Sequence, residues 1–216
     1  MIEINLNFNY GYKWYSSNGI YVKGYIFDEN NNLFNGKKLI KYFSNMISKN
    51  TIEEKLQNAN GIFTVIIKKD NLIIMAVDRT RTFPIFYSIK EGELYISDDT
   101  YFLKDKTTNK ISKDSFDEFL AAGFVTGKET LIENIYQVQA GEYILYKSNR
   151  LEYNFYADYL TSCVVNKKKE ELKNEFLDIL DRTIKRLIKF ADGRQIVVPL
   201  SGGYDSRLVV ALLKKH

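Results

Sequence analysis

The chain has 216 residues, and its 31 basic and 27 acidic side chains leave a formal net charge of +4. This mild excess is typical of a solvated surface and does not indicate nucleic-acid binding. The single cysteine excludes an internal disulfide and fits a reducing compartment. No apolar run approaches the roughly 20 residues of a membrane span, and the N-terminus lacks a signal-peptide pattern, so we expect a cytoplasmic protein without a membrane partner.

The first 156 residues mix strand-like and helix-like patterns. Apolar residues recur at helical spacing over 39–47, Thr51 with Glu54 offers a capping box for a second helix, and Ser112 begins another. Lys69-Asp70-Asn71 is typical of a hairpin turn. The strand-like runs are 2–8, 20–27, 62–68, 72–77, 93–97, 142–147 and 151–155. Several antiparallel strands with helices outside them predict an α+β layered domain.

Few side chains in this region suggest chemistry. Asp98 and Asp99 could form a metal-binding pair, but adjacent carboxylates at a strand–helix junction more often cap the next helix. Cys163 has no histidine near it in sequence and is expected to be a free structural thiol. His216, the only histidine, is the terminal residue. We therefore expect no catalytic residue in this chain.

A strand, a glycine-rich turn and a helix follow one another near the C-terminus. An amphipathic helix starting at Lys167 should end at Asp192-Gly193, and its apolar stripe should pack on a sheet. Ile196–Leu200 is a short continuous apolar run, which predicts a buried parallel strand. The turn reads Ser201-Gly202-Gly203-Tyr204-Asp205-Ser206, and a helix is expected from about Tyr204.

This turn has the composition of a phosphate cradle. Gly202 and Gly203 let the backbone approach a ligand closely, and the helix that follows directs unpaired N–H groups and its positive dipole end at the turn. Ser201 and Ser206 add hydroxyl donors, and Asp205 is placed to hold a divalent cation. The alternative is a simple strand–turn–helix connection with a serine cap, but the complete string favours phosphate binding.

The string resembles the PP-loop of the N-type ATP pyrophosphatases, which include asparagine synthetase. The resemblance implies ATP binding at Ser201, Gly202, Gly203, Asp205 and Ser206, with Mg²⁺ on Asp205, and adenylation of a carboxylate with release of pyrophosphate. Arg207 departs from the serine usual in asparagine synthetase and resembles a variant of asparagine-synthase-related proteins. The acceptor therefore need not be aspartate.

The region before it resembles the class II glutamine amidotransferase domain of the asparagine synthetase family. The resemblance rests on several segments in the family's order: 24–27, 56–63, 78–87, 94–97 and 132–156. That family uses an N-terminal cysteine as nucleophile and its free amine as base. Here residue 2 is Ile, Lys23 replaces an oxyanion-stabilising asparagine, and Tyr25 replaces a glutamate. Glutamine hydrolysis is therefore not expected. In this respect the chain resembles β-lactam synthetase, whose former glutaminase domain is only a scaffold.

We thus predict two domains. Residues 1–160 should form a degenerate amidotransferase domain with N-terminal-nucleophile-like layered antiparallel sheets and helices. Residues 161–216 should form the first elements of a truncated α/β PP-loop domain of the adenine nucleotide α-hydrolase-like type. A parallel strand needs neighbours brought back by crossovers, and one strand cannot build the sheet. We therefore expect a fragment, a truncated gene product or one half of a split enzyme.

Two functions remain open from the sequence. The first is the N-terminal part of an ATP-dependent amide-forming ligase, acting on an unidentified carboxylate and inactive as this chain alone. Its partner would be a missing C-terminal half or an oligomer partner. The second is a non-catalytic pseudo-amidotransferase scaffold. The intact set from Ser201 to Ser206 favours the ligase, because substitutions would be expected to accumulate in so small a site if the protein no longer used it.

Overall fold

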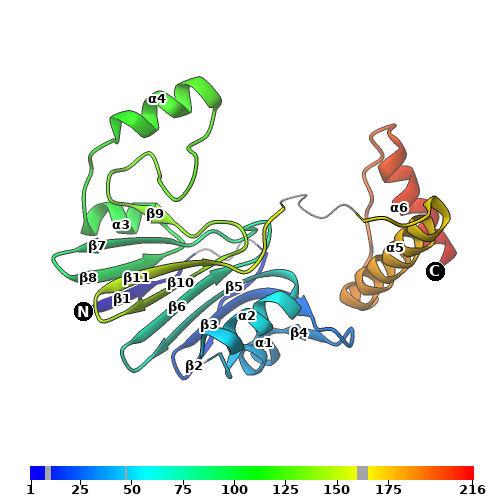
Figure 1. The fold of residues 1–216 in the computed structure, drawn as a ribbon, viewed down its shortest axis with the longest axis horizontal. Coiled ribbons are helices and arrows are strands. Elements are labelled where there is room, and N and C mark those ends of the chain that lie inside the picture. The colour runs from blue at the N-terminus through cyan, green and yellow to red at the C-terminus, as the bar shows by residue number, and fades with distance from the viewer. Residues whose placement is uncertain (8–10, 47, 160–164) are drawn as a thin grey trace. The chain divides into compact units, whose positions relative to one another are not determined.

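The computed structural model describes residues 1–7, 11–46, 48–159 and 165–216. They form two compact units, Met1–Asp158 and Tyr159–His216, which we call the first and second units (Figure 1). Among the described residues, no helix combines the length and the apolar character needed to cross a bilayer.

All strands of the described residues lie in the first unit. In chain order they are β1 (Ile2–Asn5), β2 (Tyr15–Ser17), β3 (Ile20–Phe27), β4 (Leu33–Asn35), β5 (Asn60–Lys69), β6 (Leu72–Val77), β7 (Phe86–Lys90), β8 (Glu93–Ser97), β9 (Tyr136–Gln137), β10 (Glu142–Lys147) and β11 (Arg150–Phe155). The helices of both units are α1 (Gly36–Phe43), α2 (Lys49–Asn58), α3 (Thr100–Lys106), α4 (Lys113–Ala122), α5 (Lys169–Ala191) and α6 (Tyr204–Lys215).

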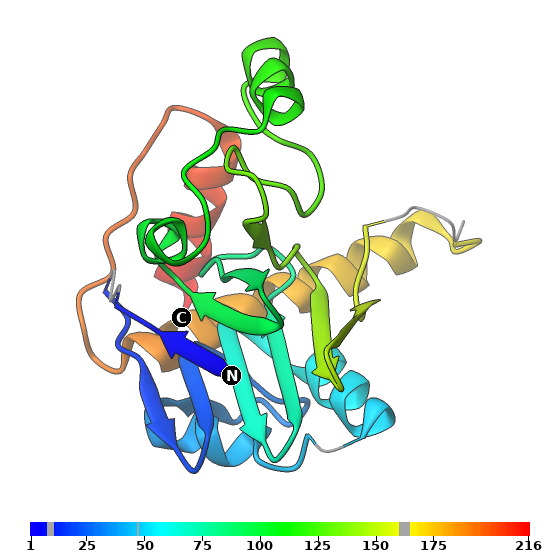
Figure 2. The same ribbon diagram turned by 90° about the vertical axis from the view of Figure 1, so that its left-hand side faces the viewer.

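The strands form two sheets. The larger has the order β11-β10-β6-β5-β3-β2, with β4 also pairing with β3, and the smaller has the order β1-β8-β7-β9. Every pairing is antiparallel except β1 with β8, which run parallel and lie side by side in Figure 2. The predicted antiparallel architecture therefore holds except at this pair, where two segments more than 90 positions apart meet through the register Ile2↔Leu94.

The sheets and helices of the first unit stack in layers (Figure 1). Strand β5 shows why, because its residues face two cores in alternation. Val65 and Ile67 pack with α1 and α2 side chains such as Phe43 and Leu56, while Ile66 packs against Leu94 of the smaller sheet. Helix α3 packs on the other face of the smaller sheet through Leu103. The α+β layered fold predicted from the sequence is confirmed.

Most predicted elements of the first unit are present, with shifts at their ends. The hairpin at Asp70-Asn71 joins β5 to β6, and Ser112 caps α4 by accepting a hydrogen bond from the Ser115 N–H. The first helix is shorter than the periodicity predicts, because α1 ends at Phe43. The capping box uses Ser48 with Thr51, so the Thr51–Glu54 box was wrong.

Asp78 is the central polar residue of the first unit. It follows β6 and is only 1% exposed. One carboxylate oxygen accepts hydrogen bonds from the Thr80 N–H (2.8 Å) and hydroxyl (2.7 Å), and the other accepts from the Thr82 N–H (3.0 Å) and the Phe63 N–H (3.2 Å). These donors replace the water that burial removes, so the turn from 78 to 83 is fixed to β5.

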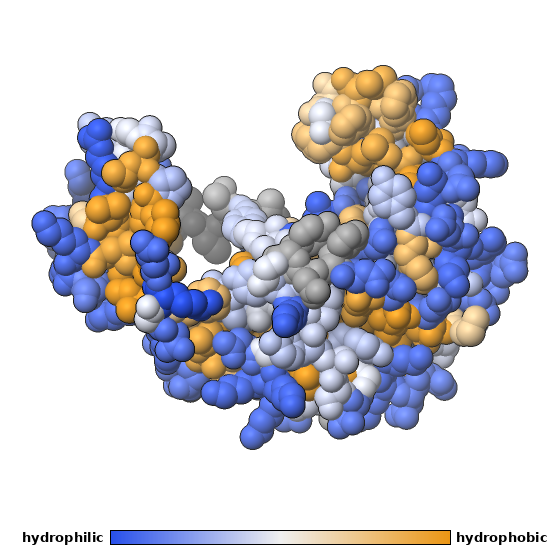
Figure 3. Space-filling view, turned by 180° about the vertical axis from the view of Figure 1, so that it is seen from behind, coloured by the Kyte–Doolittle hydropathy of each residue, from blue (hydrophilic) through white to orange (hydrophobic). Residues whose placement is uncertain are grey.

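Helix α4 carries an apolar surface. Phe116, Phe119, Leu120 and Phe124 are all at least 40% exposed, and apolar side chains gather over this part of the first unit in Figure 3. The helix ends at Gly123, whose φ of 81° gives the left-handed cap that glycine favours.

The second unit contains α5 and α6 joined by an irregular segment. Helix α5 ends where predicted, with Asp192 as the left-handed C-cap. The predicted buried strand Ile196–Leu200 is wrong: these residues form no strand, and Val197 and Leu200 are 77% and 65% exposed. A strand is stable only when its N–H and C=O groups pair with a neighbour, and the described residues of this unit include no other strand. Within the described residues of this unit the α5 stripe therefore has no sheet to cover, and Phe176 and Ile179 are exposed.

Removing the Asp78 carboxylate should destabilise the first unit strongly. We expect Asp78→Ala to lower the free energy of unfolding by about 3–5 kcal/mol, because the buried Phe63 N–H and three donors of the turn lose their charged acceptor. The readout is urea unfolding followed by the fluorescence of Trp14, the only tryptophan. Asp70→Asn is the matched control, since Asp70 lies in a turn at φ 50°, which asparagine tolerates. A loss below 1 kcal/mol for Asp78→Ala would contradict the assignment.

The buried tyrosines should make the first unit sensitive to alkali. Burial raises the pKa of Tyr42 to about 12 and also raises the pKa values of Tyr87 and Tyr143 above the ordinary value. The folded state thus keeps phenolic protons that the unfolded state loses above about pH 10. Stability is present below that pH and falls above it, by about 1.4 kcal/mol per pH unit for each such tyrosine.

Urea unfolding between pH 9 and 11 measures this slope. Tyr87→Phe should make it shallower, and Tyr101→Phe, which alters a side chain 73% exposed, should leave it unchanged. An equal slope in all three proteins would show that Tyr87 does not contribute.

Candidate functional site

A cavity of about 340 Å³ lies beside β3 in the first unit. Its walls combine aromatic rings with a few polar side chains. The lining residues are Tyr12, Trp14, Lys23, Thr82, Phe83, Pro84 and Asp98. They come from three separate stretches of sequence besides β3, so the cavity exists only once both sheets have assembled.

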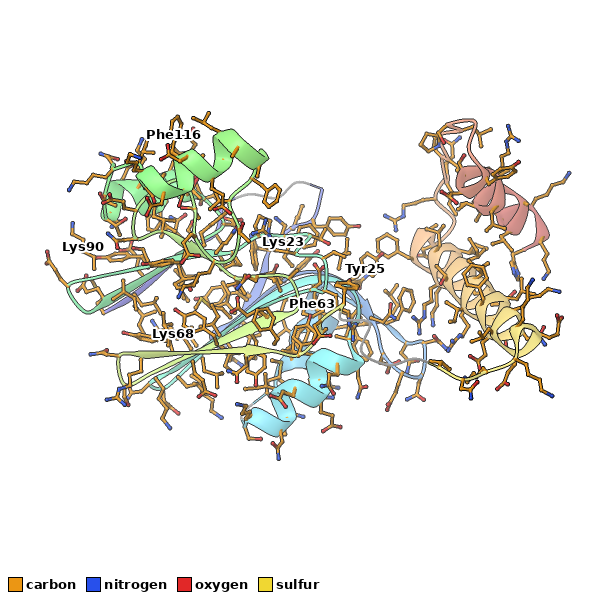
Figure 4. The ribbon with its side chains drawn as sticks, turned by 45° about the horizontal axis from the view of Figure 1, so that its top comes forward. Lys23, Tyr25, Phe63, Lys68, Lys90 and Phe116 are labelled. Carbon is orange, nitrogen blue, oxygen red and sulfur yellow. The ribbon has the colours of Figure 1, made fainter. Side chains whose placement is uncertain are left out.

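Lys23 supplies the positive charge of this cavity. It lies on β3 opposite Thr64 and is 2% exposed. Its Nζ is 5.0 Å from the centre of the Phe83 ring and 5.5 Å from that of Trp14, distances at which aromatic faces attract a cation. Burial lowers the pKa of Lys23, and the charge of Asp98 partly opposes this shift. Figure 4 shows Lys23 well away from the strand ends that carry Lys68 and Lys90.

Asp98 and Asp99 have separate structural roles. The Asp98 carboxylate accepts hydrogen bonds from the Trp14 indole N–H and from the Asn7 N–H, both at 2.8 Å. Asp99 caps α3 by accepting from the Tyr101 N–H at 2.9 Å, which confirms the capping prediction for that residue. Within the described part of the chain, no group of three or more His, Cys, Asp or Glu side chains is arranged to hold a metal ion.

The turn fixed by Asp78 builds one wall of the cavity. It places Thr82 and Phe83, and the Thr64 hydroxyl holds the Phe83 carbonyl. Gly24 makes room for the Phe83 ring: its φ is 98°, and an added Cβ would lie 2.9 Å from Phe83 Cε2 and 2.0 Å from the Ile62 carbonyl oxygen. Only glycine fits that backbone conformation and that space.

The N-terminus lies at the far end of β1 from the cavity. The Met1 amine is 3.9 Å from the Glu93 carboxylate, and Met1 is 75% exposed. From there β1 runs parallel to β8, and the chain reaches Asp98 only at Asn7. At about 3.3 Å per residue, the five steps from Ile2 to Asn7 span roughly 16 Å. The terminal amine therefore does not reach Lys23.

The predicted phosphate-binding residues lie in the second unit, at the start of α6. Gly202 has φ 80°, and an added Cβ there would meet no heavy atom within 4 Å. The positive φ, and not a lack of space, therefore favours glycine at this position. Gly203 is the N-cap without a side-chain cap. The structure brings Ser201 and Ser206 together, with their hydroxyl oxygens 3.5 Å apart. Asp205 lies in the first turn of α6, and its residue is exposed.

Two further residues were considered from the sequence. Cys163 lies outside the described residues. His216 pairs with Asp181 of α5, with Nε2 2.8 Å from a carboxylate oxygen, so it lies with the second unit.

Sequence reasoning found Lys23 but missed the cavity. Trp14, Phe83 and Asp98 carry no motif, because they meet only through the β1–β8 pairing and the turn after β6. A signal for that turn was present. The turn lies within 78–87, one of the segments on which the family resemblance rests, and Arg81 in it has a positive φ of 51°.

A larger cavity of about 390 Å³ lies beneath the apolar surface of α4. Phe86, Phe119 and Phe124 contribute to its walls, with Arg81 and Glu129 among its charged residues. Unlike Lys23, neither of these two charged residues is buried.

Comparison with known proteins places the first unit in a family. The model of the family described as "Glutamine amidotransferase domain" matches residues 45–157. The Microcin J25-processing protein McjC of Escherichia coli is 25% identical over 185 residues, which cover 84% of this chain and 34% of that protein. The chain thus spans about a third of this relative's length.

Two solved structures share 11% sequence identity with the chain. The glutamine phosphoribosylpyrophosphate amidotransferase from B. subtilis complexed with ADP and GMP matches with a TM-score of 0.38. The allosteric regulatory enzyme of purine biosynthesis matches with a TM-score of 0.34. Each match covers 68% of this chain and 31% of the other. Because the family model spans more than half of its residues, this chain belongs to the glutamine amidotransferase domain family.

Proposed function

We propose that this chain is the N-terminal part of an asparagine-synthase-like, ATP-dependent ligase that forms an amide without hydrolysing glutamine itself. The observation that carries the ligase proposal is the turn from Ser201 to Ser206 at the start of α6. A second support is the length of the match to McjC, which covers more of the chain than the first unit contains.

The turn has features that suit a nucleotide phosphate. The first N–H groups of α6 have no side-chain cap, because Gly203 is the N-cap. They and the helix dipole favour an anion, and the hydroxyls of Ser201 and Ser206 lie together on the same turn. Asp205 would hold Mg²⁺ next to the phosphates. ATP, when bound, would supply the activation of a carboxylate with pyrophosphate as leaving group.

The first unit supports the absence of glutaminase activity. Amidotransferase chemistry of this type needs a nucleophile and a base on the N-terminal residue. Here Ile2 stands where the resemblance would place the cysteine, β1 separates it from the Lys23 cavity, and Lys23 stands where the resemblance has an asparagine. The nitrogen donor would therefore be ammonia or an amine of the substrate.

The acceptor is an unidentified carboxylate. The name of McjC links that relative to the processing of microcin J25. A molecule of the microcin type is therefore one acceptor to include among the carboxylates tested.

A non-catalytic scaffold is the second candidate. The observation that favours it is the irregular segment from Ile196 to Leu200, since a nucleotide site needs a sheet to position the turn. In this alternative the first unit packs against a partner and the second unit is vestigial.

The ligase proposal predicts that Asp205 is needed for turnover. In the protein as its gene encodes it, we expect Asp205→Asn to lower ATP-dependent pyrophosphate release at least about 100-fold, because the cation loses its charged ligand. Asp178→Asn, on an exposed position of α5, is the matched control and should change nothing. This chain alone should show no ATP–pyrophosphate exchange. Full activity of Asp205→Asn would overturn the assignment of Asp205 as the cation ligand. If the unmodified protein releases no pyrophosphate, the result favours the non-catalytic scaffold.

The same proposal predicts that glutamine is not hydrolysed. Incubation with glutamine should release no glutamate above background. Glutamate should remain at background when Ile2→Cys is made and Met1 is removed, because β1 would still hold the new thiol at the strand end that lies away from the Lys23 cavity. Glutamate release by the unmodified chain would show that the first unit retains the family's reaction.

A further inference from the structure

The cavity beneath α4 has the size and the walls of a small-molecule site. Its volume of about 390 Å³ falls in the range of such sites. Apolar side chains form more than half of its lining residues: Phe86, Phe119, Phe124, Val125, Leu131 and Ile132. Phe119 and Phe124 are 40% and 61% exposed, so a ligand in the cavity would remove apolar surface from water. No lining residue is shared with the Lys23 cavity, so the two cavities are separate.

One positive and one negative side chain line this cavity. Arg81 comes from the turn after β6 and is half-buried, whereas Glu129 comes from the loop between α4 and β9 and is exposed. Neither of them forms an ion pair with another described residue. Burial lowers the pKa of Arg81, and no carboxylate charge opposes this shift. Within the described part of the chain, the Arg81 side chain donates one hydrogen bond, from Nη1 to the side-chain oxygen of Gln137, which leaves most of its five N–H donors for water or a ligand.

The Gln137 amide fixes the two segments that carry these charges. It accepts the hydrogen bond from Arg81 and donates to the main-chain carbonyls of Gly127 (3.0 Å) and Glu129 (3.2 Å). The Glu129 carboxylate stays close to the same loop, because its Oε2 would lie 3.2 Å from a Cβ added to Gly127. One amide therefore joins the turn of Arg81 to the loop of Glu129, and both charges line the cavity in fixed segments.

The complement of two opposite charges that do not pair with each other is a zwitterion. A guanidinium fork binds a carboxylate through two parallel hydrogen bonds, and a carboxylate accepts hydrogen bonds from an ammonium group. The Lys128 amine does not neutralise the neighbouring Glu129, since it lies 4.5 Å from the centre of the Tyr153 ring. A ligand with a single charge would meet one like charge in this cavity as well as one opposite charge. An amino acid with an apolar side chain matches both charges and the walls.

We propose that this cavity binds a free α-amino acid with a large apolar side chain, with its carboxylate on the Arg81 guanidinium, its ammonium group on Glu129 and its side chain against the aromatic wall. The site goes beyond the proposed ligase function, because it uses no residue of the second unit. It is also separate from the lost glutaminase chemistry, which the family resemblance assigns to the region of Lys23. The first unit is thus a receptor for an apolar amino acid.

The probe is L-phenylalanine, and isothermal titration calorimetry on the unmodified chain measures its affinity. The compound 3-phenylpropanoate lacks only its ammonium group, and phenethylamine lacks only its carboxylate, so each removes one of the two charge contacts. Glycine keeps both charges and lacks the side chain. Each of the three should bind at least about tenfold more weakly than phenylalanine. Saturation-transfer NMR gives an independent measure of binding.

Two variants test the two charge contacts separately. Arg81→Gln should weaken phenylalanine binding at least about tenfold, and Arg150→Gln, at an exposed position of β11, is its matched control. Glu129→Gln should weaken phenylalanine binding at least about fivefold without weakening 3-phenylpropanoate, because only the ammonium contact is lost. Its matched control is Glu29→Gln, at an exposed position of the turn between β3 and β4.

Three results would overturn the proposal. They are equal affinities for phenylalanine, 3-phenylpropanoate and phenethylamine, an unchanged phenylalanine affinity in either charge variant, and no binding at about 10 mM phenylalanine by either method. If Arg81→Gln does not fold, the ligand series on the unmodified chain and on Glu129→Gln decides. No step of this test requires ATP or pyrophosphate, so its failure would leave the ligase proposal unaffected.

Discussion

The buried carboxylate of Asp78 is the constraint on which the first unit depends. It directly follows β6 of the larger sheet, and the turn that it fixes leads to β7 of the smaller sheet. Its side chain also holds the Phe63 N–H of β5, and its carbonyl accepts a hydrogen bond from the Gly141 N–H just before β10. One residue therefore ties the crossing between the sheets to two strands of the larger one. A buried charge is tolerated there because donors surround it on both oxygens.

The position of the Lys23 cavity follows from this arrangement. The turn after Asp78 presents Phe83, and Gly24 leaves the space that the ring fills. Lys23 and Asp78 are both buried. Asp78 accepts hydrogen bonds from backbone and hydroxyl donors, and Lys23 lies against aromatic rings, where burial lowers its pKa. The first charge fixes the turn, and the second lies in the cavity that this turn walls.

Local patterns in the sequence predicted the local parts of the fold. Strand-like patterns identified β1, β3, β5, β6, β8, β10 and β11, and turn residues identified the hairpin at Asp70, because these features depend on neighbours in sequence. The parallel pairing of β1 with β8 could not be predicted this way, since it joins segments far apart in the chain. The same holds for the cavity: Lys23 was identified from a resemblance, but Trp14 and Phe83 became neighbours only through tertiary packing.

The second unit shows the opposite error, in which a correct local pattern gave a wrong element. Ile196–Leu200 has the apolar character of a buried strand. A strand forms only where its backbone N–H and C=O groups pair with a neighbouring strand, whatever its side chains. Helix α6 needs no such partner, because its hydrogen bonds are internal, and it forms where the sequence predicts. The turn between them thus keeps the half of the phosphate cradle that is local: Gly202 at positive φ, the uncapped start of the helix, and the Ser201–Ser206 contact. The described residues of this unit include no sheet, and a strand paired with Ile196–Leu200 is the change that would convert this turn from an exposed loop into a site that can position a nucleotide.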